Sequence, residues 1–84
     1  MDKYKIVLFF SNNCNHCCKV ESFIYSIHDD VKCDIKLINT DNNRKLALDN
    51  SIEFLPTVDV YKNDELIDRI VGLQELSRYY KKIK

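Results

Sequence analysis

The chain is poor in residues that interrupt regular structure, and it has no excess of either charge. Its 84 residues include one Gly, one Pro and no Trp, and 13 basic residues balance 13 acidic ones. With a hydrophobic content of 45%, this scarcity of Gly and Pro argues against disorder and favours an ordered globular chain. The zero net charge gives no electrostatic case for binding nucleic acid or an anionic membrane surface.

Long apolar runs are missing too. The longest, residues 6–10, is far too short to span a bilayer. The start of the chain, residues 1–4, leads directly into this run and does not resemble a signal peptide. We therefore expect a cytoplasmic protein without membrane association, in a compartment that keeps thiols reduced. The sequence contains no linker and no repeat. We therefore expect residues 1–84 to form a single domain that folds without a stabilising disulfide or metal ion.

Four cysteines are present, and two of them form the motif Cys14-Asn15-His16-Cys17. The motif lies between a predicted strand and a predicted helix, so one thiol lies at the helix N-terminus and the other one turn further in. Unpaired backbone N–H groups at that end stabilise a thiolate, which is the form that attacks a disulfide. The motif alone also fits half of a metal site or a structural disulfide.

The alternation of apolar and polar residues predicts the element order β-α-β-α-β-β-α. Strands are expected at 4–10, 34–39, 57–61 and 66–71, and helices at 15–28, about 42–50 and about 74–83. Thr40-Asp41 is expected to cap the second helix, and Asp29-Asp30 with Lys32 to form a turn after the first. Residues 62–65 predict the turn of an antiparallel hairpin. Because the β-α-β opening makes two strands parallel, we expect a four-stranded mixed sheet with helices on both faces.

Four sequence features follow one another along the chain in a characteristic order. They are the strand–Cys14-x-x-Cys17–helix unit, the segment 41–52, the run Leu55-Pro56-Thr57-Val58, and Gly72 after the hairpin. Together they resemble the thioredoxin and glutaredoxin family over nearly the whole length. The resemblance implies an α/β minimal thioredoxin fold without the extra N-terminal strand and helix of full-length thioredoxins. It also implies the activity of a thiol–disulfide oxidoreductase.

The resemblance assigns roles to particular residues. Cys14 is expected to be the nucleophile and Cys17 the resolving thiol of a redox-active disulfide. The Leu55–Pro56 bond is expected to be cis and to face the cysteines. A cis bond there turns the Leu55 backbone N–H and C=O outward, where an extended substrate can pair with them as an added strand. The expected substrate-binding residues are Leu55, Pro56, Thr57 and Gly72.

Several positions depart from the family pattern. Leu8 stands where typical thioredoxins carry a buried acid, so a carboxylate at that position cannot accept the proton of Cys17. Asn13 replaces the Trp that normally precedes the first cysteine. Leu73-Gln74-Glu75 replaces the Gly-Gly and Asp that hold the glutathione carboxylate in glutaredoxins. The glutathione-binding pattern of that branch is therefore absent.

The expected substrates are disulfides or dithiols of proteins or small molecules. Since there is no flavin or nicotinamide fingerprint, we expect no cofactor, and recharging by a separate reductase, by glutathione or by a thiol oxidase. The chain is expected to be a monomer. One alternative is a metal-binding or metal-handling protein that uses Cys14, His16 and Cys17, with or without Cys18. Pro56 disfavours it, because in this fold a proline facing the cysteines obstructs ligation.

A second alternative is a thioredoxin-like adaptor without catalysis, which the two intact cysteines disfavour. The remaining cysteines lie outside the motif. Cys18 is expected to be a passive, half-buried side chain, although it borders the face of Cys17 and could serve as another resolving thiol or a third metal ligand. Cys33 is expected at the end of the sheet away from Cys14, with a structural role.

His16 leads to a prediction about the redox potential. A residue directly before the second cysteine lies close to the Cys14 sulfur, and an imidazolium or N–H donor there favours the thiolate. Disulfide isomerases and periplasmic oxidants of the family also carry His at this position. A stabilised thiolate stabilises the dithiol form, so we expect a reduction potential above that of thioredoxin, about −180 to −230 mV. A measured potential at or below that of thioredoxin would mean that His16 is only an exposed polar residue.

Overall fold

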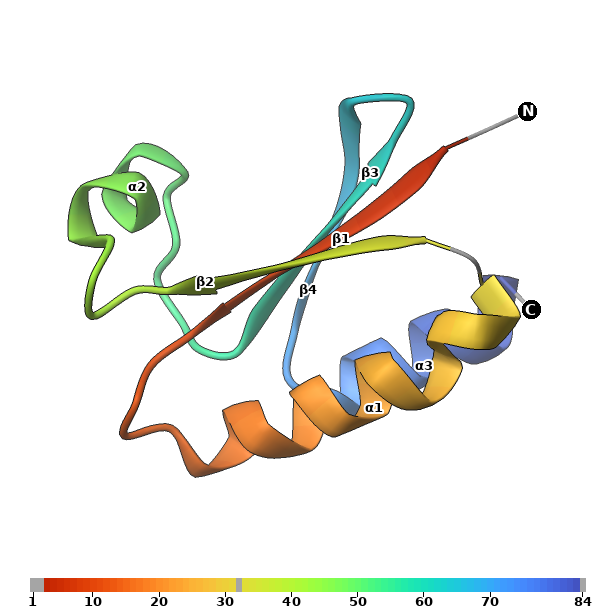
Figure 1. Cartoon of the computed structure of the whole chain (residues 1–84), viewed down its shortest axis with the longest axis horizontal. Coiled ribbons are helices and arrows are strands. Elements are labelled where there is room, and N and C mark those ends of the chain that lie inside the picture. The colour runs from red at the N-terminus through yellow and green to blue at the C-terminus, as the bar shows by residue number, and fades with distance from the viewer. Residues whose placement is uncertain (1–2, 32, 84) are drawn as a thin grey trace.

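The elements follow the predicted order. The computed structural model describes residues 3–31 and 33–83 (Figure 1). The strands are β1 (Tyr4–Phe10), β2 (Asp34–Asn39), β3 (Thr57–Lys62) and β4 (Glu65–Val71), and the helices are α1 (Asn15–Val31), α2 (Arg44–Asp49) and α3 (Leu73–Ile83). Among these residues, no helix is both long and apolar enough to cross a membrane.

The strands form one mixed sheet in the order β2-β1-β3-β4. β1 is parallel to β2 and antiparallel to β3, and β3 is antiparallel to β4. The parallel pair follows from the crossover through α1. Asn63 and Asp64 between β3 and β4 have φ angles of 53° and 68°, as expected where two central residues make a tight hairpin turn. The register of this hairpin slips between Val60 and Tyr61, which the alternating pattern did not predict.

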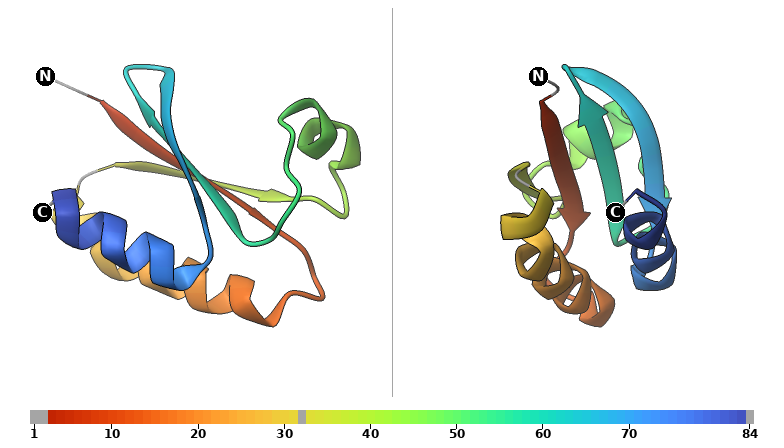
Figure 2. Two further views of the ribbon diagram at one scale, coloured as in Figure 1. Left: turned by 180° about the vertical axis from the view of Figure 1, so that it is seen from behind. Right: turned by 90° about the vertical axis from the view of Figure 1, so that its right-hand side faces the viewer.

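Helices cover the two faces of the sheet unequally (Figures 1 and 2). α1 and α3 lie side by side on one face, where the rings of Phe23 and Tyr80 meet edge to face with centroids 5.9 Å apart. They bury the larger core, whose fully buried side chains are Leu8, Val20, Ile24 and Val58. α2 lies on the other side, where a smaller cluster contains Val7, Phe9 and Ile38. Leu8, at the centre of β1, therefore contributes only to apolar packing.

Two predictions about the helices were wrong. α1 continues to Val31, so the expected turn at Asp29-Asp30 lies within the helix, and Lys32 is outside the described residues. α2 begins at Arg44 after Asn43, and no side chain caps it. Asp41 lies two residues before the N-cap position Asn43, and its carboxylate instead accepts a hydrogen bond from the backbone N–H of Asn12, in the loop after β1. A short acceptor side chain bonds the nearest unsatisfied N–H, and tertiary structure decided which one that is.

The core of α1 gives a test of this packing. Replacing Ile24 with Ala removes a fully buried side chain between α1 and the sheet, so we expect the free energy of unfolding to fall by about 2–5 kcal/mol. Its neighbour Tyr25 is 53% exposed, and Tyr25→Ala is expected to change that energy by less than about 1 kcal/mol. Urea denaturation measures both values, and equal losses in the two variants would contradict the orientation of α1.

Candidate active site

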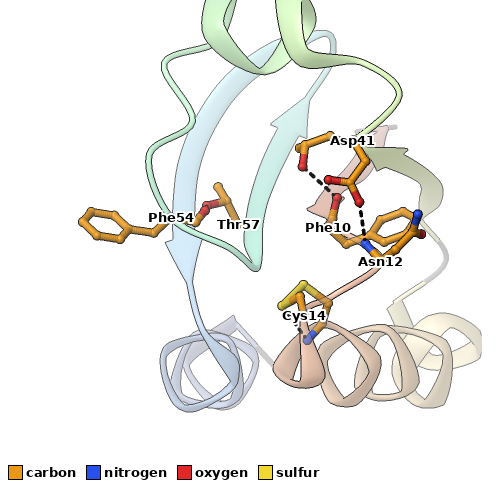
Figure 3. Close-up of a disulfide and its surroundings, with 8 residues drawn as sticks. Phe10, Asn12, Cys14, Asp41, Phe54 and Thr57 are labelled. Carbon is orange, nitrogen blue, oxygen red and sulfur yellow. Dashed lines mark hydrogen bonds between the residues drawn. A yellow bond between two sulfur atoms is a disulfide. The ribbon is translucent and has the colours of Figure 1, made fainter.

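Cys14 and Cys17 form a disulfide at the start of α1, with their Cα atoms 5.3 Å apart (Figure 3). Cys14 directly precedes the first helical residue and is partly exposed, whereas Cys17 is only 3% exposed. The difference arises because Cys17 shares a helix face with Val20 and Ile24, three and seven residues further on, and this face packs on the sheet. One sulfur is therefore accessible and the other is buried.

The backbone around Cys14 favours negative charge on its sulfur. The N–H of Cys17 points at the Cys14 Sγ, with a nitrogen–sulfur distance of 3.2 Å. It is one of the first-turn N–H groups that have no partner within a helix. No acidic residue lies in the first turn of α1 to oppose the positive end of the helix dipole. After reduction, this environment favours a thiolate on Cys14.

The loop that carries Cys14 is hydrogen-bonded to the loop after β2 (Figure 3). The Asn12 N–H donates to the Asp41 carboxylate over 2.9 Å. The N–H and the hydroxyl of Thr40 both donate to the carbonyl of Phe10, at 2.7 and 3.1 Å. These bonds join the two loops at the carboxyl ends of the parallel strands β1 and β2. Cys14 is thus presented from a loop whose position is set by the sheet.

The segment before β3 forms the other side of the site. The Leu55–Pro56 peptide bond is cis, and the Thr57 hydroxyl donates a hydrogen bond to the carbonyl of Phe54. In Figure 3, Thr57 lies on the side of Cys14, while the Phe54 ring points away from the disulfide and is 65% exposed. Pro56 and Thr57 are buried, and Leu55 is half-buried.

Gly72 joins this segment to the end of β4. Its N–H donates to the carbonyl of Pro56 over 3.1 Å. Its φ of +89° lies in the left-handed region that L side chains rarely adopt, although a Cβ would meet nothing within 4 Å. Glycine is therefore favoured here by its backbone conformation and not by lack of space. The structure thus brings Leu55, Pro56, Thr57 and Gly72 together in one hydrogen-bonded unit.

His16 and Cys18 are both exposed in the first turn of α1. The prediction that Cys18 is half-buried was therefore wrong. Cys18 directly follows the buried Cys17, and one residue of an α-helix turns the side chain by about 100°, away from the sheet. Among the side chains that the structure describes, which leave out those of residues 27–32, no three of His, Cys, Asp or Glu gather to hold a metal ion. The structure gives the metal-binding alternative no support.

Cys33 lies just before β2, whose first residue pairs with Lys5 near the start of β1. It is therefore at the opposite end of the sheet from Cys14, which follows the end of β1. Cys33 is 4% exposed, and burial raises the pKa of its thiol. A buried thiol of raised pKa forms little thiolate and reacts slowly.

Sequence reasoning missed an ion pair close to this site. Asp59 in β3 is completely buried, and its two carboxylate oxygens accept hydrogen bonds from the Arg69 guanidinium at 2.7 and 3.0 Å. This contact raises the pKa of Arg69. The third guanidinium nitrogen donates to the carbonyl of Ser51 over 3.4 Å. The available signal was a single carboxylate in the middle of the apolar strand 57–61.

Comparison with known proteins gives a consistent result. The family model described as thioredoxin matches residues 1–84. The thioredoxin of Porphyra purpurea is 30% identical over 69 residues, which are 80% of this chain and 64% of that protein. The thioredoxin of Griffithsia pacifica is 33% identical over 69 residues, which are 80% of this chain and 63% of that protein. The chain thus spans less than two thirds of the length of these curated relatives.

Solved structures show the same fold. A thioredoxin structure from Plasmodium falciparum superposes with a TM-score of 0.82 at 24% identity, covering 98% of this chain and 83% of that one. The thioredoxin of Fasciola hepatica gives a TM-score of 0.81 at 20% identity, covering 94% and 77%. The predicted fold class, an α/β minimal thioredoxin fold, is confirmed by this likeness.

The two cysteines outside the disulfide are expected to differ in reactivity. In the oxidised, folded protein, iodoacetamide should modify the buried Cys33 at least about tenfold more slowly than the exposed Cys18. Because burial raises the pKa of Cys33, its modification should also require a higher pH than that of a free cysteine. Mass spectrometry of peptides after timed alkylation measures both rates, with Cys18→Ser as the control. Equal rates at the two positions would contradict the burial of Cys33.

Proposed function

The chain belongs to the thioredoxin family, and we propose that it is a small thiol–disulfide oxidoreductase that works through Cys14 and Cys17. The observation that supports this most directly is the disulfide at the start of α1, with one accessible and one buried sulfur. The cis Leu55–Pro56 bond and the N–H donor aimed at the Cys14 sulfur add to it. The proposal includes that residues 1–84 form a single domain.

In the reductive direction, the Cys14 thiolate attacks one sulfur of a substrate disulfide. A bond forms between Cys14 and that sulfur, the substrate bond breaks, and the other substrate sulfur leaves as a thiolate. Cys17 then attacks the Cys14 sulfur, which restores the Cys14–Cys17 disulfide and releases the second substrate sulfur. Two electrons pass to the substrate, and the single proton of Cys17 passes to one of its two released sulfurs, so that the other leaves as a thiolate. His16 would favour the initial thiolate on Cys14.

Protein substrates fit the surroundings of the disulfide. An extended segment can pair with the outward backbone groups of Leu55, in the manner of an added strand. Phe54 is exposed next to Leu55 and Val71 next to Gly72, so apolar side chains flank this segment. Within this proposal Leu55, Pro56, Thr57 and Gly72 hold the substrate, while Cys14 performs the attack.

The partners and the location are part of the same proposal. Since the pair alone carries the electrons, a separate reductase, glutathione or a thiol oxidase has to restore its starting state. The protein acts as a monomer in a reducing compartment such as the cytoplasm, where a Cys-x-x-Cys pair cycles and is not held permanently oxidised.

The decisive experiment is the reduction of insulin by dithiothreitol, followed as turbidity, with wild type, Cys14→Ser and Cys17→Ser. We expect turnover by the wild type and only the background rate in both variants, since each loses one of the two sulfurs. Cys17→Ser should in addition accumulate a mixed disulfide between Cys14 and insulin, visible on a non-reducing gel. Cys18→Ser is the matched control, and it should retain the wild-type rate.

Two outcomes would replace this proposal. Wild type without turnover that still captures partner proteins would indicate the adaptor alternative. Stoichiometric zinc in the purified protein, together with no turnover, would revive the metal-binding alternative. A third outcome would change only the resolving residue: turnover that is lost in Cys18→Ser but kept in Cys17→Ser would show that Cys18 resolves the mixed disulfide in place of Cys17.

A further inference from the structure

The Asp59–Arg69 pair is an unusual element of the sheet. Asp59 lies in β3, between β1 and β4, and is 0% exposed, whereas the side chain of Arg69 is 31% exposed. Removing a carboxylate from water costs several kcal/mol by rough estimate, and an ion pair often does no more than offset that cost. A well-packed apolar pair would stabilise the sheet at least as well. Stability alone therefore does not account for this pair.

Arg69 also contacts a third element. Two of its nitrogens hold the two oxygens of Asp59, and the remaining one donates to the carbonyl of Ser51. Ser51 lies after α2, has a φ of 56°, and begins the connection that leads to β3. The planar guanidinium, with five donors in a fixed geometry, can make these bonds at once. It therefore links β3 and β4 to the first residue of the segment Ser51–Pro56.

The other end of the same segment is held by different bonds. The Gly72 N–H donates to the Pro56 carbonyl, and the Thr57 hydroxyl donates to the Phe54 carbonyl. Asp59 and Thr57 are two residues apart on the same face of β3, and Arg69 and Gly72 are three residues apart. The Ser51–Pro56 segment is thus hydrogen-bonded to the β3–β4 hairpin at both ends, and Arg69 holds the end that is farther from the disulfide.

We propose that Asp59 and Arg69 are positioning residues. They hold the Ser51–Pro56 segment in the position in which its backbone binds protein substrates. This inference rests on the proposed function, in which the Leu55 backbone binds the substrate. The hydrogen bonds of Arg69 go to Asp59 and to Ser51, not to Cys14 or Cys17. The pair therefore affects the binding of an extended substrate chain, and it leaves the reaction of Cys14 with a small disulfide unchanged.

Arg69→Lys tests this with a small change. Lysine keeps the positive charge beside Asp59, but its single ammonium cannot span both carboxylate oxygens and the Ser51 carbonyl. We expect the KM for insulin to rise about tenfold with little change in kcat, because misplacement of a binding segment by about 1 Å is enough for such an effect. The rate with 5,5′-dithiobis(2-nitrobenzoate), a small disulfide, should stay within about twofold of wild type. Asp59→Asn, which keeps the side-chain shape, should act in the same direction.

Arg78→Lys is the matched control. Arg78 makes an exposed ion pair with Glu75 on α3 and has no bond to the Ser51–Pro56 segment. Its KM for insulin should therefore equal that of wild type. Thermal unfolding by circular dichroism shows that each variant is folded at the assay temperature.

Hydrogen exchange gives a readout that does not depend on activity. The Gly72 amide, which donates to the Pro56 carbonyl, should exchange about tenfold faster in Arg69→Lys than in wild type or Arg78→Lys. If wild type has no turnover, the proposed function fails and this measurement alone decides the positioning role. Wild-type exchange together with wild-type KM in Arg69→Lys would overturn the inference. Equal losses with insulin and the small disulfide would overturn it as well, because the pair would then act on the sulfur chemistry.

Discussion

The packing of α1 against the sheet is the constraint on which the rest of the structure depends. It buries Val20 and Ile24 between the helix and β1, and the same helix face carries Cys17 inward. Cys14, just before the helix, remains partly exposed, and the N–H of Cys17 points at its sulfur. The asymmetry of the two sulfurs is thus a consequence of helix phase, because residues three and seven apart share one face.

The site lies at one end of the strands, where the loop after β1 and the segment before β3 meet. The loop with Cys14 is bonded to the loop after β2, and the Leu55–Pro56 segment is bonded to the end of β4. Each of these bonds joins residues far apart in the sequence. The two sides of the site therefore keep their relative position only as long as the sheet is intact, and the small size of the chain does not prevent a well-defined site.

The register slip in the β3–β4 hairpin has a consequence for charge. Near the turn, Lys62 pairs with Glu65 and Tyr61 with Leu66, and continuing this register would place Asp59 opposite Asp68. One extra residue in β4 places Arg69 there instead. Two carboxylates facing each other repel, whereas the observed register satisfies the buried Asp59 with a cation. The register slip thus places Arg69 beside Asp59, and the ion pair in turn favours the slipped register.

The sequence by itself determined the element order, the mixed sheet, the family and the cysteine motif, because periodicity, turn residues and spacing are local signals. Tertiary structure decided what those signals leave open. The buried carboxylate of Asp59 found its partner only through a slipped register, and Asp41 bonded a distant N–H and not the nearby helix end. Cys18 was misjudged because its exposure depends on the helix rotation that buries Cys17. A side chain's partner depends on which groups folding brings near, and spacing along the chain does not specify that.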